Sequence, residues 1–176
     1  MLFRSDIRYS MTGVLMEMRK VDEATKILEA LLKKEPDNPT FNNDLGYIWA
    51  DNNKNMDKCE QLVRKALEED RKLRAKAKEK VAADEPDDNA SYLDSLGWVL
   101  FRKKQYQDAL KPLQEASRME GGMNIEIYDH LADVLMALGR KEEARKAYAL
   151  GIELASSSRR DQSKKIEVEN KIKAIK

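Results

Sequence analysis

Side chains suited to catalysis or metal binding are few and scattered in this sequence. His130 is the only histidine and Cys59 the only cysteine among 176 residues. One of each cannot supply the ligands of a structural zinc site, and a lone cysteine cannot form an intrachain disulfide. Asp129 precedes His130, but neighbours in a helix point about 100° apart, so adjacency does not make them a catalytic pair. The sequence therefore predicts no catalytic residue and no metal site.

The remaining candidate motifs also read as structural. There is no phosphate-binding glycine loop, and Gly121 and Gly122 are typical of a connection between helices. Cys59 stands where two helices are expected to meet closely, so we expect a buried, inert thiol. We therefore expect no cofactor, and the sequence does not predict an enzyme.

Charge is high but balanced, which argues against a general nucleic-acid binder. Charged residues make up 37% of the chain, and the formal net charge is +1. One local run is basic, and its members are Arg71, Lys72, Arg74, Lys76, Lys78 and Lys80. This run could attract RNA or an anionic membrane, but it lacks interleaved aromatic residues and an apolar face. A solvated helix extension is the expected interpretation.

The spacing of apolar residues predicts helices throughout. Apolar residues recur at steps of three and four, and no alternating strand run occurs. A pattern of small and large residues returns four times at a spacing of about 34 residues, most clearly at 92–98 and 128–132. The copies predict a single domain, 1–176, with hairpins at 5–38, 39–70 with an extension at 71–88, 90–123 and 125–158, and a capping helix at 159–176.

Small residues at fixed positions should let the two helices of each hairpin approach closely. The expected pairs are Thr12 with Ala24, Gly46 with Cys59, Gly97 with Ala109, and Ala132 with Ala144. The capping helix is expected to cover the last apolar edge with Ile166, Ile172 and Ile175.

These copies resemble the tetratricopeptide repeat family over nearly the whole chain, and Leu93–Val99 is similar to a segment of its bacterial members. The match departs at Arg8 and Asn42, where the family usually has a large apolar residue. The resemblance implies an all-α, right-handed α-α superhelix of about four hairpins plus the capping helix. It also implies a scaffold that binds a protein or peptide in a concave groove formed by the first helices.

The resemblance carries ligand-facing positions onto this chain. They are Tyr9, Asn43, Tyr47, Asp94, Trp98, Phe101, Glu126, Asp129, Asp133 and Met136, with Asp6 and Met16 beside them. Aromatic residues and carboxylates suggest a ligand with an apolar anchor next to Lys or Arg. Alternatively, Tyr47 and Trp98 pack between first helices and the acids are ordinary solvated residues.

Other hypotheses stay open at this level. The Lys/Asn/Arg clamp that family members use for acidic chaperone tails is absent, so such a tail is not the expected ligand. The chain could instead be an accessory repeat domain of a larger enzyme or envelope assembly, or a homo-oligomer that associates through an apolar edge beside Leu2 and Phe3. The compartment is not determined; the cytoplasm is favoured, and the periplasm applies if a signal lies upstream.

Overall fold

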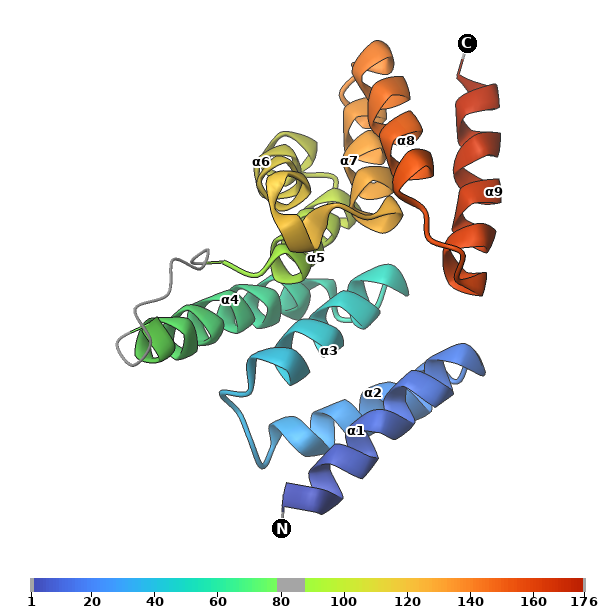
Figure 1. Cartoon of the computed structure of the whole chain (residues 1–176). Coiled ribbons are helices and arrows are strands. Elements are labelled where there is room, and N and C mark those ends of the chain that lie inside the picture. The colour runs from blue at the N-terminus through green and yellow to red at the C-terminus, as the bar shows by residue number, and fades with distance from the viewer. Residues whose placement is uncertain (1, 79–87, 176) are drawn as a thin grey trace. The chain divides into compact units, whose positions relative to one another are not determined.

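The computed structural model describes residues 2–78 and 88–175, and all regular elements in these ranges are helical (Figure 1). The helices of the N-terminal half are α1 (Leu2–Glu17), α2 (Val21–Leu32), α3 (Pro39–Asp51) and α4 (Met56–Lys78). Those of the C-terminal half are α5 (Ala90–Arg102), α6 (Tyr106–Arg118), α7 (Ile125–Ala137), α8 (Lys141–Leu154) and α9 (Arg159–Ala174), with a 3-10 turn η1 (Glu120–Gly122) between α6 and α7.

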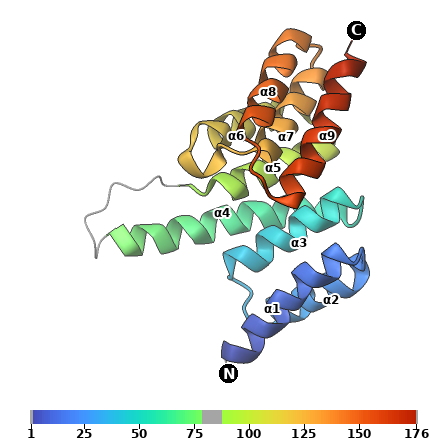
Figure 2. The ribbon, with the colours of Figure 1, turned by 45° about the vertical axis from the view of Figure 1, so that its right-hand side comes forward.

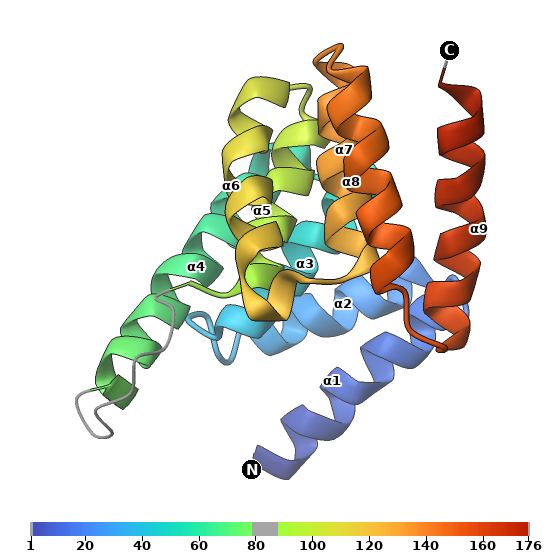
Figure 3. The ribbon, with the colours of Figure 1, turned by 45° about the horizontal axis from the view of Figure 1, so that its top comes forward.

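The chain forms two compact units. Unit 1 is Met1–Asp87 and unit 2 is Asp88–Lys176. In each unit successive helices pair as hairpins, α1 with α2 and α3 with α4 (Figure 2), and α5 with α6 and α7 with α8 (Figure 3). In unit 2, α9 contacts both α7 and α8. The single domain 1–176 and its repeat boundaries stay predictions.

The first helix of three hairpins, and α9, begin at a capping side chain. Asn38, Asn89 and Asn124 each accept a hydrogen bond from a backbone N–H in the first turn of α3, α5 and α7. Ser158 does the same for α9, through the N–H of Asp161. Such caps satisfy N–H groups that have no partner within the helix, so they fix where each of these helices starts.

Close approach within hairpins depends on the predicted small residues. A Cβ atom added to Gly46 would lie 2.8 Å from Val63 Cγ2 and 3.0 Å from the carbonyl oxygen of Cys59. A Cβ atom added to Gly97 would lie 2.4 Å from Leu113 Cγ. Cys59 is buried, as predicted from its position, and its thiol donates to the carbonyl oxygen of Lys54 over 3.3 Å.

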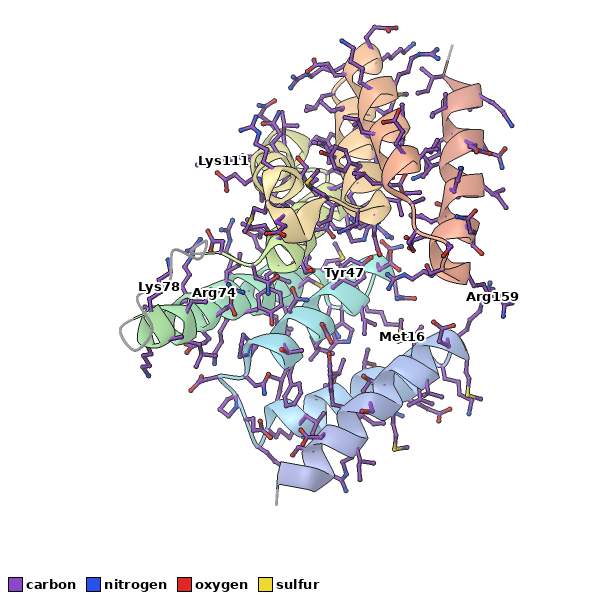
Figure 4. All side chains as sticks on the ribbon, viewed as in Figure 1. Met16, Tyr47, Arg74, Lys78, Lys111 and Arg159 are labelled. Carbon is purple, nitrogen blue, oxygen red and sulfur yellow. The ribbon has the colours of Figure 1, made fainter. Side chains whose placement is uncertain are left out.

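Helix α4 continues into the predicted extension as far as Lys78, and Figure 4 shows Arg74 and Lys78 near its C-terminal end. The cations here meet acids one turn back: Lys72 Nζ lies 2.7 Å from Glu68 Oε1, and Arg74 Nε lies 2.7 Å from Asp70 Oδ2. Glu68 and Glu69 raise the pKa of the Lys72 ammonium. Such pairs are typical of a solvated helix. Residues 79–87 of the extension, with Lys80, lie outside the described residues.

The turns inside the hairpins share a left-handed residue. Arg19, Asn53, Lys104 and Gly139 have φ of 58°, 53°, 63° and 76°. A side chain destabilises this conformation, and glycine adopts it freely. We therefore expect Lys104→Gly to raise the free energy of unfolding by about 1 kcal/mol in urea titrations. The neighbouring variant Gln105→Gly is the control, because Gln105 has a φ of −89°; an equal gain there would contradict this explanation.

Candidate functional site

Several predicted groove residues join successive first helices. The hydroxyl of Tyr9 on α1 donates to Asp44 Oδ2 on α3 over 2.7 Å. Asp94 on α5, at the position equivalent to Tyr9, lies 2.8 Å from His130 Nδ1 on α7. Burial raises the pKa of Asp44, and the bonds from Tyr9 and Asn43 only partly offset this. The repeat position of Tyr9 and Asp94 therefore contributes to packing between hairpins within each unit. This role was not predicted from the sequence.

The pair of Asp94 and His130 is part of a buried cluster. The ring of Trp98 stacks on His130 with centroids 4.2 Å apart and on Phe101 at 5.1 Å. Burial alone lowers the pKa of His130, but the nearby carboxylates, Asp94 foremost, outweigh it, so the net pKa is above its ordinary value. When protonated, His130 therefore forms an ion pair with Asp94 of the preceding hairpin, whereas the carboxylate of Asp129 contacts lysines of α9.

This ion pair should make stability depend on pH. Because folding raises the pKa of His130, its contribution is complete below about pH 6.5 and is lost as the pH rises through the folded pKa. We expect the midpoint of thermal unfolding to fall as the pH is raised above about 6.5. The variant His130→Gln should remove most of this fall, since the chain has no other histidine. A fall of equal size in that variant would show that other groups cause it.

Cations of α9 occupy the acidic end of the predicted groove. Lys171 Nζ lies 2.7 Å from Asp129 Oδ1 and 2.8 Å from Asp133 Oδ2. Lys164 Nζ lies 2.8 Å from Asp129 Oδ2. Burial lowers the pKa of both lysines, but the nearby carboxylates raise it by more than burial lowers it. Both pKa values therefore lie above the ordinary value. A third cation of α9, Arg160, pairs with Glu126.

The partners on α9 were missed in the sequence, although the seven-residue spacing of Lys164 and Lys171 places both on one helix face. The prediction for Ile166 was wrong, because 62% of its surface is exposed. Val168, which lies between the two lysines, is buried instead, together with Ile175. The side of α9 that contacts α7 thus carries one buried apolar residue, Val168, between two lysines that pair with acids of α7.

Four predicted residues of unit 2 are half-buried. Trp98 and Asp133 each follow the small residue of their helix, and Phe101 and Met136 each lie three residues further on. Because these are equivalent positions on α5 and α7, their side chains lie on corresponding faces. Asp133 accepts a hydrogen bond of 2.5 Å from the hydroxyl of Tyr148. Burial first, and Asp133 next, raise the pKa of that hydroxyl.

Unit 1 carries its own members of the predicted set. Asn43 is buried, and its amide lies 3.2 Å from Asp44 Oδ1. Tyr47 on α3 and Met16 on α1 are half-buried (Figure 4). Asp6 is exposed on α1. The predicted groove residues therefore fall into two sets, one in each unit, and their role in binding stays a prediction.

Comparison with known proteins identifies the repeat. Sequence families described as tetratricopeptide repeat match residues 14–73, 89–119 and 125–158. The chain belongs to the tetratricopeptide repeat family. A TPR repeat-containing protein of Pseudomonas aeruginosa is 30% identical over 111 residues, which are 63% of this chain and 16% of that protein. The chain thus spans only about a sixth of the length of this curated relative.

Solved structures show the same fold. Yeast Tom70 matches with a TM-score of 0.65 and 17% identity, over 95% of this chain and 32% of Tom70. Pseudomonas aeruginosa PilF matches with a TM-score of 0.64 and 17% identity, over 96% of this chain and 69% of PilF. MamA of Desulfovibrio magneticus matches with a TM-score of 0.59 and 14% identity, over 97% of this chain and 94% of that MamA chain. The predicted all-α tetratricopeptide fold is confirmed.

A tetratricopeptide repeat chain of this kind is a protein–protein interaction domain, and the repeat matches support that coarse function. Within residues 2–78 and 88–175, none of the helices has the length and hydropathy needed to cross a bilayer. In the same ranges, histidine, cysteine and carboxylate side chains form no cluster of three or more that could hold a metal ion.

Proposed function

We propose that the chain binds a protein segment on the first-helix face of unit 2 formed by Trp98, Phe101, Asp133 and Met136. The observation that supports this most is the ordering of Trp98. Its ring is held by stacking on the buried ring of His130, and yet it is half-buried rather than enclosed. A rigid aromatic ring gives contact area at low entropic cost, so Trp98 suits the role of an anchor.

The proposed ligand carries an apolar or aromatic side chain next to Lys or Arg. The apolar group would contact Trp98 and Phe101, and the cation would approach Asp133. The side chain of Asp133 is 18% exposed and already pairs with Lys171, so a ligand cation would share or displace that contact. We therefore expect charge to select among ligands and the aromatic pair to supply most of the affinity.

A library of random peptides displayed on phage tests this proposal without a known partner. Peptides selected on the intact chain should be enriched in an aromatic or large aliphatic residue next to Lys or Arg. Their affinity, measured by fluorescence anisotropy, should fall about tenfold or more in Trp98→Ala. Lys111→Ala is the matched control, because Lys111 is exposed on the second helix α6 (Figure 4). Equal affinity for both variants, with folding intact, would overturn the proposal.

The alternative function is that of an accessory domain in a larger protein, in which the same face would bind another part of that protein. The relative from Pseudomonas aeruginosa is much longer than the matched region, which keeps this alternative open. In that case the ligand segment would come from the same polypeptide, and the peptide preference would match a stretch of that longer protein.

A further inference from the structure

An open cleft of about 300 Å³ lies between the two helices of the second hairpin of unit 1. Its apolar lining is Leu45 and Trp49 of α3 with Leu62 of α4, and α4 adds the polar residues Lys58, Gln61 and Lys65. We call the hollow lined by these six residues the α3–α4 cleft. Its volume is at the low end for ligand pockets, so it suits an anchoring side chain better than a whole cofactor.

Helix spacing explains why these residues gather. Leu45 and Trp49 are four residues apart and therefore share one side of α3. The four lining residues of α4 stand at i, i+3, i+4 and i+7, which is also one side of a helix. Gly46 lets the two sides approach, because a Cβ atom added there would lie 3.3 Å from the Cβ atom of Leu62.

The cleft is separate from the groove predicted on the first helices. The predicted groove residue of α3, Tyr47, is two residues away from both Leu45 and Trp49. Two residues turn a helix by about 200°, so the side chain of Tyr47 leaves α3 on the side opposite to theirs. A ligand in the α3–α4 cleft would therefore not occupy the predicted groove.

The charge at the edge of the cleft departs from that of the other hairpins. Lys58 is the third residue of α4. The third residues of the other second helices, α2, α6 and α8, are Glu23, Asp108 and Glu143. Acids are favoured in the first turn of a helix and cations are disfavoured there, so Lys58 does not serve the stability of α4. A residue that breaks such a local rule indicates a functional role.

Both lysines of the cleft can meet a ligand carboxylate. The side chain of Lys58 is on an exposed residue. Lys65 Nζ lies 2.8 Å from Asp37 Oδ1, but 70% of the Asp37 side chain is exposed. Exposed ion pairs contribute little to stability, so a ligand carboxylate can share or replace Asp37 at low cost. The lysines are seven residues apart, which is about 10 Å along α4.

We propose that the α3–α4 cleft binds an acidic segment of a partner protein. A large apolar side chain of that segment contacts Leu45, Trp49 and Leu62, and carboxylates on both sides of it meet Lys58 and Lys65. Charge complementarity selects this occupant, because a basic segment would be repelled by the two ammonium groups. The preference is opposite to that of the face around Trp98, so the chain would hold two different kinds of segment.

Nuclear magnetic resonance of the intact chain tests this proposal directly. The chain has two tryptophans, so the indole N–H signal of Trp49 reports on the cleft and that of Trp98 on the other face. The variant Trp49→Phe assigns the two signals. The probe is a short synthetic peptide of Glu and Gly residues around one Phe. We expect it to shift the Trp49 signal in a saturable way and to leave the Trp98 signal in place. A shift of the Trp98 signal alone would overturn the proposal.

Variants separate the cleft from general attraction of opposite charges. Lys58→Glu should weaken binding of the peptide about tenfold or more without lowering the midpoint of thermal unfolding, since an acid suits the first turn of α4. Lys111→Glu changes the net charge equally and is the control, because the Lys111 side chain is 82% exposed on α6. A peptide with Ala in place of Phe should also bind about tenfold more weakly. Equal losses in the two lysine variants, or equal binding of the two peptides, would contradict the proposed site.

Discussion

The variant Gly122→Ala should lose about 3 kcal/mol or more of unfolding free energy. Gly122 closes the turn η1 between α6 and α7, and a Cβ atom there would lie 1.8 Å from the carbonyl oxygen of Ala116 and 2.7 Å from its carbonyl carbon. These are backbone atoms of α6, so no side chain can rotate away to make room. The methyl group can be accommodated only by moving η1 away from α6, which would disturb the joint between the two hairpins of unit 2.

The adjacent residue supplies the control. A Cβ atom added to Gly121 would meet nothing within 4 Å, and Gly121 is exposed. Gly121→Ala should therefore leave stability unchanged within about 0.5 kcal/mol. Urea unfolding followed by circular dichroism measures both variants. Similar losses in the two would mean that turn entropy, and not the contact with Ala116, determines the effect.

The second large effect is expected for Asp129→Ala, which should cost about 2 kcal/mol. Asp129 is 1% exposed and holds both Lys164 and Lys171, so its removal leaves two half-buried ammonium groups with poorer partners. The estimate lies below the 3–5 kcal/mol typical of a fully buried pair because the lysines still reach water. Lys171 also keeps Asp133, which further limits the loss.

A double-mutant cycle separates this interaction from general damage. Lys171→Met retains the apolar stem of the side chain and removes the charge, so the loss caused by Asp129→Ala should be smaller in that background. The pair of Glu126 and Arg160 is the comparison, because the side chain of Arg160 is 75% exposed. Glu126→Gln should change stability by less than about 1 kcal/mol. Fully additive losses of Asp129→Ala and Lys171→Met would contradict a direct ion pair.

The expected effects of the Asp129 and Lys171 variants both arise at the contact between α7 and the C-terminal helix α9. Helix α9 buries the apolar side chain of Val168, and the buried Ile175 follows directly after its end. Its lysines Lys164 and Lys171 contact acids of α7. The same acids were candidates for ligand binding. A charged ligand at Asp133 would therefore also act on the contact between α7 and α9, which links the proposed binding face to the stability of the C-terminal helix.

Local sequence pattern determined much of the fold. The steps of three and four between apolar residues predicted helices, and the return of the pattern predicted hairpins. The small residues Gly46 and Gly97 predicted where helices approach closely. These features are readable because helix periodicity and the repeat are properties of neighbouring residues. The burial of Cys59 was predicted from its place in that pattern.

The tertiary structure alone decided which side chains the polar residues meet. Asp94 pairs with His130, 36 residues away, and Asp129 pairs with Lys171, 42 residues away. A sequence position gives the direction of a side chain on its own helix, but its partner depends on how the next helix is rotated and how far it is shifted along its axis. For the same reason Val168, and not Ile166, is buried.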